Sequence, residues 1–462
     1  MRLMSSPQKA FLLLLVLFLS LAHVSRSQEV DATTDSSQTT ADSSGALPPK
    51  IIAIIIEGNR RTKGHIIMRE MKSRVGGHVD RELVEGDQKR ILNLGLFNRV
   101  EIQGLALEEG VQLFVIVDER WNLWPYPILF VNDRDWDKLS YGAGLLYFNF
   151  RGRNETISAS GWGGFNPALQ LDYSNPWIFG RQHLFGRWRF YAERVQNRFF
   201  KASNLEVNEK RVGGSFTIGK RFGYFTYVSM LLGYSQLRFD PPVPGQTLNP
   251  SGRDVLPTLG LTYLYDARDL YEYPRAGTYL RVSARRVGFG SEYIHYWRFG
   301  FDARRYQKLS HHLTVAARVM MDVGHDQIPV YDLVYLGYQN RVRGHFFEKM
   351  SGRNLALGSV ELRVPIVPLR YFRAAGMPVI KDMLPEALLE MGRNTKFGVS
   401  LGVFADYGLV WSEAKFPELQ NGLKGYGAGL HFHVPLIDVL RFEVGMNEKG
   451  KLQNFIDIGV SF

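Results

Sequence analysis

The chain has 462 residues, a formal charge of +11 and no cysteine. The lack of cysteine excludes thiolate metal sites, a cysteine nucleophile and a lipid anchor on cysteine, and it suits an oxidising compartment. Although a basic chain can bind nucleic acid, the lysines and arginines here are spread along predicted strands and turns. Nucleic acid is therefore not a predicted partner.

The first 27 residues predict a secretory signal peptide. Arg2 and Lys9 precede an apolar core at 10–21, and either Ser20 with Ala22 or Ser25 with Ser27 fits a cleavage site. The alternative is an uncleaved anchor, but twelve residues are short for a span of about 20. Residues 28–49 are rich in Ser, Thr, Asp and Ala, a composition that predicts a mobile linker.

Residues 50–120 predict a small α/β domain. A β-branched apolar run at 51–56 predicts a strand, and apolar residues recur at helical spacing through 62–72 and 80–94. Thr62 and Asp80 are the expected N-caps of these helices. Strands follow at 97–104 and 111–117, so the order is β-α-α-β-β.

Residues 121–462 predict an all-β domain of sixteen antiparallel strands. An even number places both ends of a transmembrane barrel on one side of the membrane, and the loop at 324–353 then lies on the opposite side. The predicted strands are 125–131, 139–149, 155–163, 167–173, 182–192, 212–221, 224–237, 256–265, 277–287, 293–307, 312–324, 354–364, 397–409, 423–433, 439–446 and 452–462.

Two of these strands show which face of the sheet is apolar and which is polar. In 354–364, Val360 and Leu362 alternate with Glu361, and in 397–409, Val403 alternates with Asp406. An apolar outer face with a polar inner face is typical of a membrane β-barrel, and it places both carboxylates in the lumen. The alternative is a buried sheet in a soluble sandwich.

Several short motifs, in the same chain order, resemble the BamA/TamA-type outer-membrane assembly superfamily, which also holds the two-partner secretion transporters. Residues 57–62, 94–100 and 115–120 resemble a POTRA domain. The barrel motifs are Asn175-Pro176-Trp177, Tyr265-Asp266-Ala267-Arg268-Asp269, Val342-Arg343-Gly344-His345, Glu361-Leu362-Arg363-Val364-Pro365, Phe404-Ala405-Asp406 and Gly425-Tyr426-Gly427. The resemblance implies a periplasmic POTRA domain followed by a 16-stranded transmembrane barrel.

Two features depart from the family pattern. His345 stands where the loop motif has an aromatic residue. The turn at 365–396 is long for the periplasmic side, and its 383–391 piece could form an amphipathic helix or a solvent-covered lid.

The loop motif predicts a contact that we call the lumenal lock, made of Val342, Arg343, Gly344, His345, Glu361 and Asp406. Arg343 is expected to fold into the lumen and pair with Asp406 and with Glu361, either as a purely structural contact or as part of the activity.

No catalytic residue, metal or cofactor is expected. His431 and His433 share a lumen-type face but lack a third ligand, and the sequence holds no nucleophile elbow or phosphate-binding loop. A lipid hydrolase is the enzyme-class alternative.

A second predicted site is a lateral seam between the first and last strands, at Pro127, Ile128 and Phe130 on one side and Ile456, Ile458, Val460 and Phe462 on the other. Prolines cannot donate ladder hydrogen bonds, so the seam is expected to be weak. The final Phe462 resembles the terminal signal of outer-membrane barrels. A third predicted site is a client-binding edge at Phe97, Val100 and Ile102, unless the small domain is only a rigid spacer.

The resemblance implies a factor that inserts β-barrel clients into a bacterial outer membrane through the seam. Its expected partners are unfolded outer-membrane proteins, outer-membrane lipids and accessory periplasmic or lipoprotein subunits. A two-partner secretion transporter and a passive channel are the alternatives. The single POTRA-like domain and the linker favour the first interpretation over secretion.

Overall fold

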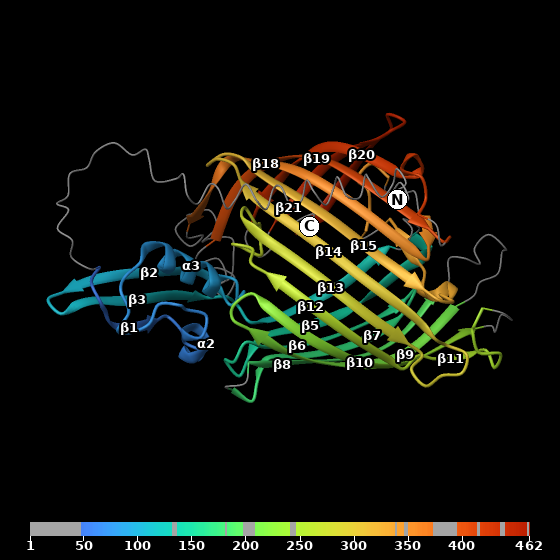
Figure 1. Ribbon diagram of the computed structural model, residues 1–462, viewed down its shortest axis with the longest axis horizontal. Coiled ribbons are helices and arrows are strands. Elements are labelled where there is room, and N and C mark those ends of the chain that lie inside the picture. The colour runs from blue at the N-terminus through green and yellow to red at the C-terminus, as the bar shows by residue number, and fades with distance from the viewer. Residues whose placement is uncertain are drawn as a thin grey trace, which may run out of the picture.

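The computed structural model describes residues 48–131, 136–180, 183–196, 208–240, 246–337, 340–345, 350–372, 395–413, 416–434, 439–459 and 462. The predicted signal peptide, nearly all of the predicted linker and the predicted helix at 383–391 lie outside these residues. Figure 1 shows a small α/β domain at one end of a large barrel of strands.

The amino-terminal domain has the predicted β-α-α-β-β order. Strand β3 lies in the middle of its sheet, parallel to β1 and antiparallel to β2. Its elements are β1 (Ile51–Glu57), α2 (Gly64–Met68), α3 (Arg81–Leu92), β2 (Phe97–Leu107) and β3 (Gly110–Glu119). The helices and the sheet enclose an apolar core that includes Ile66, Ile67, Met71, Ile91, Leu96, Phe97, Val100, Val115 and Val117.

A side chain caps the N-terminus of α3, whereas none caps the N-terminus of α2. The Asp80 side chain accepts from the backbone N–H of Glu82 and of Leu83, so the predicted cap of α3 is confirmed. The predicted helix at 62–72 is wrong in extent, because α2 begins at Gly64 and ends at Met68. Thr62 does not cap α2, since its hydroxyl accepts a hydrogen bond from Asn149 of the barrel at 2.8 Å.

The barrel contains the sixteen predicted strands, each joined to the next by an antiparallel ladder; a further short strand, β11, pairs with the end of β10. The strands are β4 (Leu123–Val131), β5 (Leu139–Phe150), β6 (Glu155–Gly164), β7 (Ala168–Ile178), β8 (Leu184–Gln196), β9 (Asn208–Phe222), β10 (Thr226–Asp240), β11 (Arg253–Val255), β12 (Thr258–Asp266), β13 (Gly277–Val287), β14 (Tyr296–Lys308), β15 (Thr314–His325), β18 (Asn354–Phe372), β19 (Thr395–Trp411), β20 (Leu423–His433), β21 (Leu440–Asn447) and β22 (Leu452–Ile458).

Alternation along the strands separates an apolar outer face from a polar lumen, as predicted. Val360, Leu362 and Val403 are exposed on the outside, whereas Glu361 and Asp406 are buried in the lumen. Within the described residues, no helix is long and apolar enough to cross a membrane.

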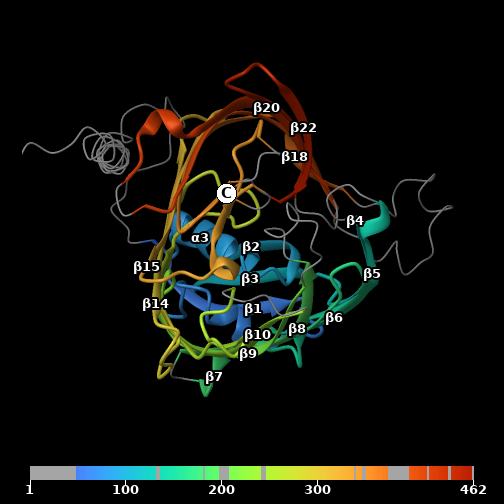
Figure 2. The ribbon, with the colours of Figure 1, turned by 90° about the vertical axis from the view of Figure 1, so that its right-hand side faces the viewer.

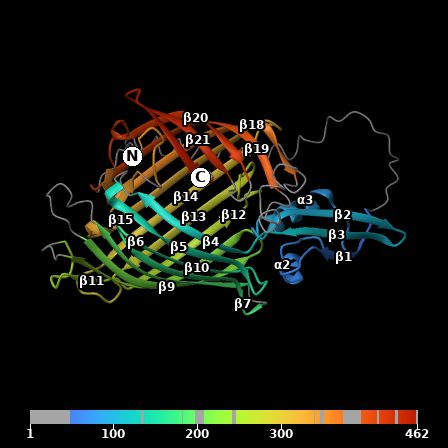
Figure 3. The same cartoon turned by 180° about the vertical axis from the view of Figure 1, so that it is seen from behind.

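The two ends of the barrel sheet meet at β4 and β22, which are neighbours in the circular strand order. Paired registers join the successive strands from β4 round to β22. Hydrogen bonds also join β22 to β4, so the barrel is closed. Figure 3 shows β4 and β5 on the side of the barrel that is hidden in Figure 1.

The prediction of a last strand at 452–462 is wrong at its end. Strand β22 ends at Ile458, and the chain turns at Gly459, which has a φ of +86°. The Phe462 ring is buried against Tyr306, with 6.4 Å between the ring centroids, on the lumen side of β14. Phe462 therefore does not lie on the seam.

The amino-terminal domain docks against the turns at one end of the barrel. Figure 2 looks along the barrel from the other end, and the domain is seen across the opening. Both terminal nitrogens of Arg221 donate to the Glu70 carboxylate at 2.7 Å. Further contacts are the hydrogen bonds Tyr224 Oη to Met71 O, Asn93 Nδ2 to Asp269 O, Tyr271 N to Asn93 Oδ1 and Lys63 N to Gly152 O.

We expect Glu70→Gln to loosen this docking, because Arg221 loses its bidentate partner while it stays largely buried. Breaking such a pair costs about 3–5 kcal/mol. Spin labels on cysteines placed at Glu109 and Leu309, both exposed, should then give a broader distance distribution. The chain has no native cysteine to interfere.

Arg81→Gln is the matched control for this measurement. Arg81 pairs with Glu85 on the exposed side of α3, and such surface pairs contribute little. The same broadening in both variants would contradict an anchoring role for Glu70.

Candidate functional site: an arginine-centred ion network in the lumen

A loop between β15 and β18 enters the lumen and carries the Val-Arg-Gly motif. Its stem is a small hairpin of β16 (Val334–Leu336) and β17 (Met350–Gly352). Val342 packs into an apolar cluster formed by Leu336, Leu355, Leu357 and Val410. The cluster fixes the loop against β18 and β19, so the next residue, Arg343, has a defined position.

The Arg343 side chain is surrounded by carboxylates and is only 4% exposed. Its Nε and Nη2 donate to Asp406 at 2.7 and 2.8 Å, and its Nη1 donates to Glu361 at 2.6 Å. The guanidinium also lies over the Phe404 ring, 3.6 Å from the centroid. The structure therefore brings the predicted partners of Arg343 together.

Glycines make the space that the loop tip needs. Gly344 has a φ of +107°, a conformation that residues with a side chain rarely adopt. A Cβ atom on Gly425 would lie 1.8 Å from the backbone oxygen of Arg343, and one on Gly408 would lie 2.6 Å from Val342. The wall of the lumen is thus shaped to receive this loop.

Sequence reasoning missed Glu443, which accepts from Arg343 Nη1 at 3.0 Å. Glu443 shares a face of β21 with Arg441, so the alternation of that strand could have indicated it. The missed residues extend the lumenal lock into a chain of charges that joins four strands and the loop. Its further pairs are Arg363 with Glu361, Arg441 with Glu443, Arg441 with Asp457, and Arg341 with Asp457.

This chain of charges reaches the last strand, because Asp457 lies on β22. The four arginines of the network face four carboxylates, so their formal charges balance. Buried charges persist only when they are paired in this way. The position of the loop and the position of β22 are consequently linked by ion pairs.

His345 is also part of the site, at the rim of the barrel. Its Nε2 lies 2.9 Å from the Lys424 backbone oxygen and 2.8 Å from the Glu448 carboxylate. At this position the imidazole uses hydrogen bonds to hold the loop, where the family motif has an aromatic ring.

Glu361, His431 and Glu443 lie close enough together to be considered as metal ligands. However, Arg343, Arg363 and Arg441 already donate to the two carboxylates. A cation would have to displace these guanidinium groups. The donor set therefore fits an ion-pair network and not a metal site.

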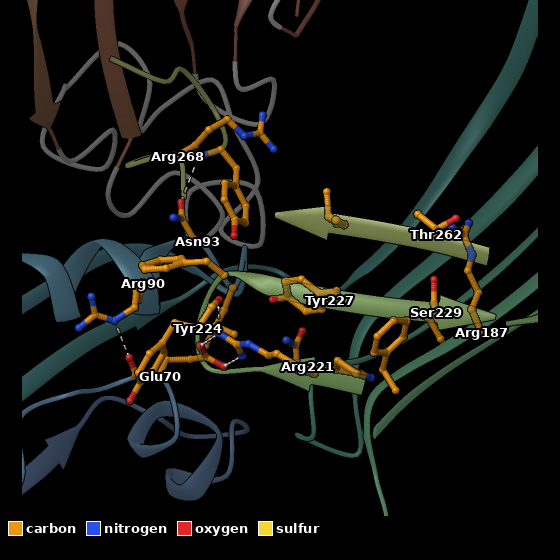
Figure 4. A pocket seen from close by; sticks show the side chains of 18 of the residues that line it. Glu70, Arg90, Asn93, Arg187, Arg221, Tyr224, Tyr227, Ser229, Thr262 and Arg268 are labelled. Carbon is orange, nitrogen blue, oxygen red and sulfur yellow. Dashed lines mark hydrogen bonds and ion pairs between the residues drawn. The ribbon is translucent and has the colours of Figure 1, made fainter. Parts of the chain in front are cut away.

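A second feature is a cavity of about 820 Å³ between the amino-terminal domain and the lumen. Figure 4 shows Glu70, Arg90 and Asn93 of the domain near Arg221 and Tyr224 of the barrel. Eight cations and two carboxylates line the cavity: Arg69, Lys89, Arg90, Arg187, Arg189, Arg221, Arg268 and Arg281, with Glu70 and Asp269.

Burial shifts the pKa of two groups beside this cavity. Desolvation lowers the pKa of Arg69 from its ordinary value and raises the pKa of Tyr271. The Tyr271 hydroxyl is therefore neutral, and six of the eight cations around the cavity form ion pairs with Glu70, Asp87, Asp172 or Asp266.

The predicted seam residues do not all lie where they were expected. Alternation places Pro127 and the exposed Leu129 on the outer face of β4, and Ile128 and Phe130 on the lumen face. Phe130 contacts Trp162 edge-on, with 6.1 Å between the ring centroids. On β22, Ile456 faces outward and is 69% exposed, whereas Val460 lies outside the described residues.

The hydrogen-bond pattern shows which backbone groups of β4 face the seam. Phe148 N–H donates to Asn122 O, so the even-numbered residues of β4 bond to β5. The backbone N–H and C=O groups of the odd-numbered residues therefore point toward β22. Pro125 and Pro127 stand at two of these positions, and each removes a donor from the seam.

The residues of the predicted client-binding edge lie on an edge strand, but two of them point into the core of the domain. Strand β2 is an edge strand of its sheet within the described residues, but Phe97 and Val100 are both 3% exposed in the domain core. Ile102 packs partly against the same core. A client could pair with the β2 backbone, but it could not contact the buried side chains of Phe97 and Val100.

Comparisons with known proteins agree with this architecture. A family model described as an Omp85 superfamily domain matches residues 149–377, and a POTRA model, described as a surface antigen variable number repeat, matches residues 49–120. A structure of BamA from Haemophilus ducreyi lacking POTRA domains 1–3 is 19% identical with a TM-score of 0.51, over 89% of this chain and 83% of that chain. CdiB from Escherichia coli is 11% identical with a TM-score of 0.51, over 100% of this chain and 99% of that chain.

At these sequence identities the solved structures show a shared fold. The two family models together match well over half of the chain. The chain belongs to the Omp85 superfamily, with a POTRA domain ahead of its β-barrel. This membership indicates an outer-membrane barrel with the POTRA domain on the periplasmic side.

We expect Arg343→Ala to cost about 3–5 kcal/mol of stability, because three buried carboxylates lose their shared cation. Arg343→Lys should be intermediate, since an ammonium cannot hold Asp406 with a planar fork. The temperature at which the folded band disappears in a gel-mobility assay measures the effect. Arg187→Ala is the control, because Arg187 is half exposed beside Asp172. An equal loss in both alanine variants would argue against the network.

We expect Gly425→Ala to displace the loop while every charge is kept, because the added methyl group would overlap the Arg343 backbone oxygen. Its folded band should disappear at a lower temperature, as for Arg343→Ala. Gly358→Ala on β18 is the matched control, since nothing lies within 4 Å of the added carbon there. If Gly425→Ala melts like Gly358→Ala, the loop tip does not depend on the shape of the wall.

Proposed function

We propose that this protein inserts and folds β-barrel clients in a bacterial outer membrane through the seam between β4 and β22. The observation that carries the proposal is the pair of prolines on the edge of β4 that faces β22. Pro125 and Pro127 stand at positions whose backbone points toward β22, so this edge lacks two hydrogen-bond donors. An edge of this kind can pair with a client strand.

The contents of the lumen support lateral insertion over passive diffusion. The ion-paired loop extends into the lumen, and Phe462 occupies a further part of it beside Tyr306. A passive channel needs an open lumen, whereas lateral insertion needs an edge that can open. The chain of charges from Arg343 to Asp457 would hold β22 in place until a client binds.

The proposed partners follow from this mechanism. Unfolded outer-membrane proteins would arrive at the POTRA domain and pair with the backbone edge of β2 before reaching the cavity beneath the barrel. Outer-membrane lipids would surround the open seam, and periplasmic or lipoprotein subunits could assist. We propose no enzymatic step, because the burial of the client's own apolar face supplies the free energy.

The test is reconstitution of the full chain in liposomes, followed by the protease-resistant folding of a denatured small barrel protein. We expect faster client folding than in empty liposomes. A disulfide between cysteines at Leu129 and Ile456, which both face outward, should abolish the acceleration, and a reductant should restore it. Asn454 is the alternative partner if the register is shifted by two residues.

Ile128→Cys with Ile456→Cys is the matched control. These positions face opposite sides of the sheet, so the pair cannot form a bridge and should keep the wild-type activity. No acceleration by the wild-type protein, or equal activity with the seam bridged, would refute the proposal.

Secretion of a polypeptide through the lumen is the second candidate, because the superfamily resembled by this sequence includes such transporters. The cationic cavity below the lumen would give a polypeptide an entrance. The bridged seam separates the two functions: it should leave the entry of a denatured polypeptide into the liposome interior unchanged while it blocks insertion.

A further inference from the structure

Four cations form one row across the outer face of the barrel. The strand registers place Arg194 opposite Lys210, Lys210 opposite Arg238, and Arg238 opposite Arg253. The row therefore crosses β8, β9, β10 and β11. With about 4.8 Å between neighbouring strands, it spans about 14 Å.

These four side chains share the lipid-facing side of the sheet. The next row toward the barrel centre has Val212 opposite Ala192 and Gln236, and Val212 is 60% exposed. Leu237, in contrast, points inward and packs beneath Tyr331 of the loop that enters the lumen. The cations consequently border the apolar band directly.

The row lies at the end of the barrel opposite the POTRA domain, where Figure 1 shows β11. Lys220, on the same strand and the same face as Lys210, lies ten residues away at the POTRA end. At about 3.4 Å per residue and a tilt of about 40°, ten residues span about 26 Å of membrane thickness. This span matches an apolar band of about 25 Å, so the row lies at the level of lipid headgroups on the far side.

The charge of the row is only partly balanced by the described residues. Asp240 forms an ion pair with Lys210 and also interacts electrostatically with Arg194 and Arg238, so one carboxylate faces four cations. Like charges directly opposite one another are destabilising unless they share a counter-charge. All four cations also line a cavity of about 620 Å³.

We propose that this row, Arg194, Lys210, Arg238 and Arg253, binds the phosphate groups of a lipid headgroup that carries two or more phosphates. A row of about 14 Å is too long for one phosphate and suits two that are held apart on one headgroup. The neighbouring apolar side chains would contact the acyl chains. The site does not depend on the proposed insertase activity.

The probe is a fluorescent diphosphoryl lipid A, titrated into the full chain in a neutral detergent and followed by anisotropy. We expect tighter binding than for the monophosphoryl form. Each cation removed should weaken binding about fivefold, so Lys210→Gln with Arg238→Gln should weaken it about 25-fold. The folded gel band verifies each variant, and Arg238→Gln alone serves if the double variant does not fold.

Lys220→Gln is the matched control, because it removes the same charge from the same face of β9 at the opposite end. It should bind the probe as the wild type does. Equal weakening in Lys220→Gln, no weakening in the row variants, or full displacement by excess inorganic phosphate would overturn the proposal. The last result would indicate a site for a free anion.

Discussion

The guanidinium of Arg343 and its three carboxylates form the interaction on which the lumen depends. The group is buried, so its charge must be paired, and the pairing requires the loop tip, β18, β19 and β21 to be in place together. The glycine-lined wall and the Val342 cluster both serve this geometry. Arg343 thereby joins the loop to carboxylates 18, 63 and 100 residues further along the chain.

The same network links the loop to the strand that meets β4 at the proposed seam. Asp457 lies on β22, and it pairs with Arg341 of the loop and with Arg441 of β21. The outer edge of β22 faces β4, where two prolines remove hydrogen-bond donors. Ion pairs therefore hold β22 from inside the lumen, beside an edge of β4 that lacks two hydrogen-bond donors.

The net positive charge is concentrated in particular places. Eight cations surround the cavity between the POTRA domain and the lumen, and four form the row on the outer face at the opposite end. Within the lock, by contrast, arginines and carboxylates balance. Six of the eight cations beside the cavity form ion pairs, whereas one carboxylate, Asp240, faces the four cations of the row.

The sequence by itself determined the strand–helix order of the POTRA domain, the sixteen strands and the inward direction of Glu361 and Asp406, because strand and helix periods are local properties of the chain. It also indicated Arg343 through a motif. Tertiary structure decided what depends on register and packing between distant segments. Examples are Glu443 beside Arg343, Ile128 on the lumen face, Phe97 in a core, Thr62 bonded to the barrel, and the turn at Gly459 that carries Phe462 away from the seam. Alternation assigns a residue to one of two faces, but only the closed arrangement of strands determines which residues meet across them.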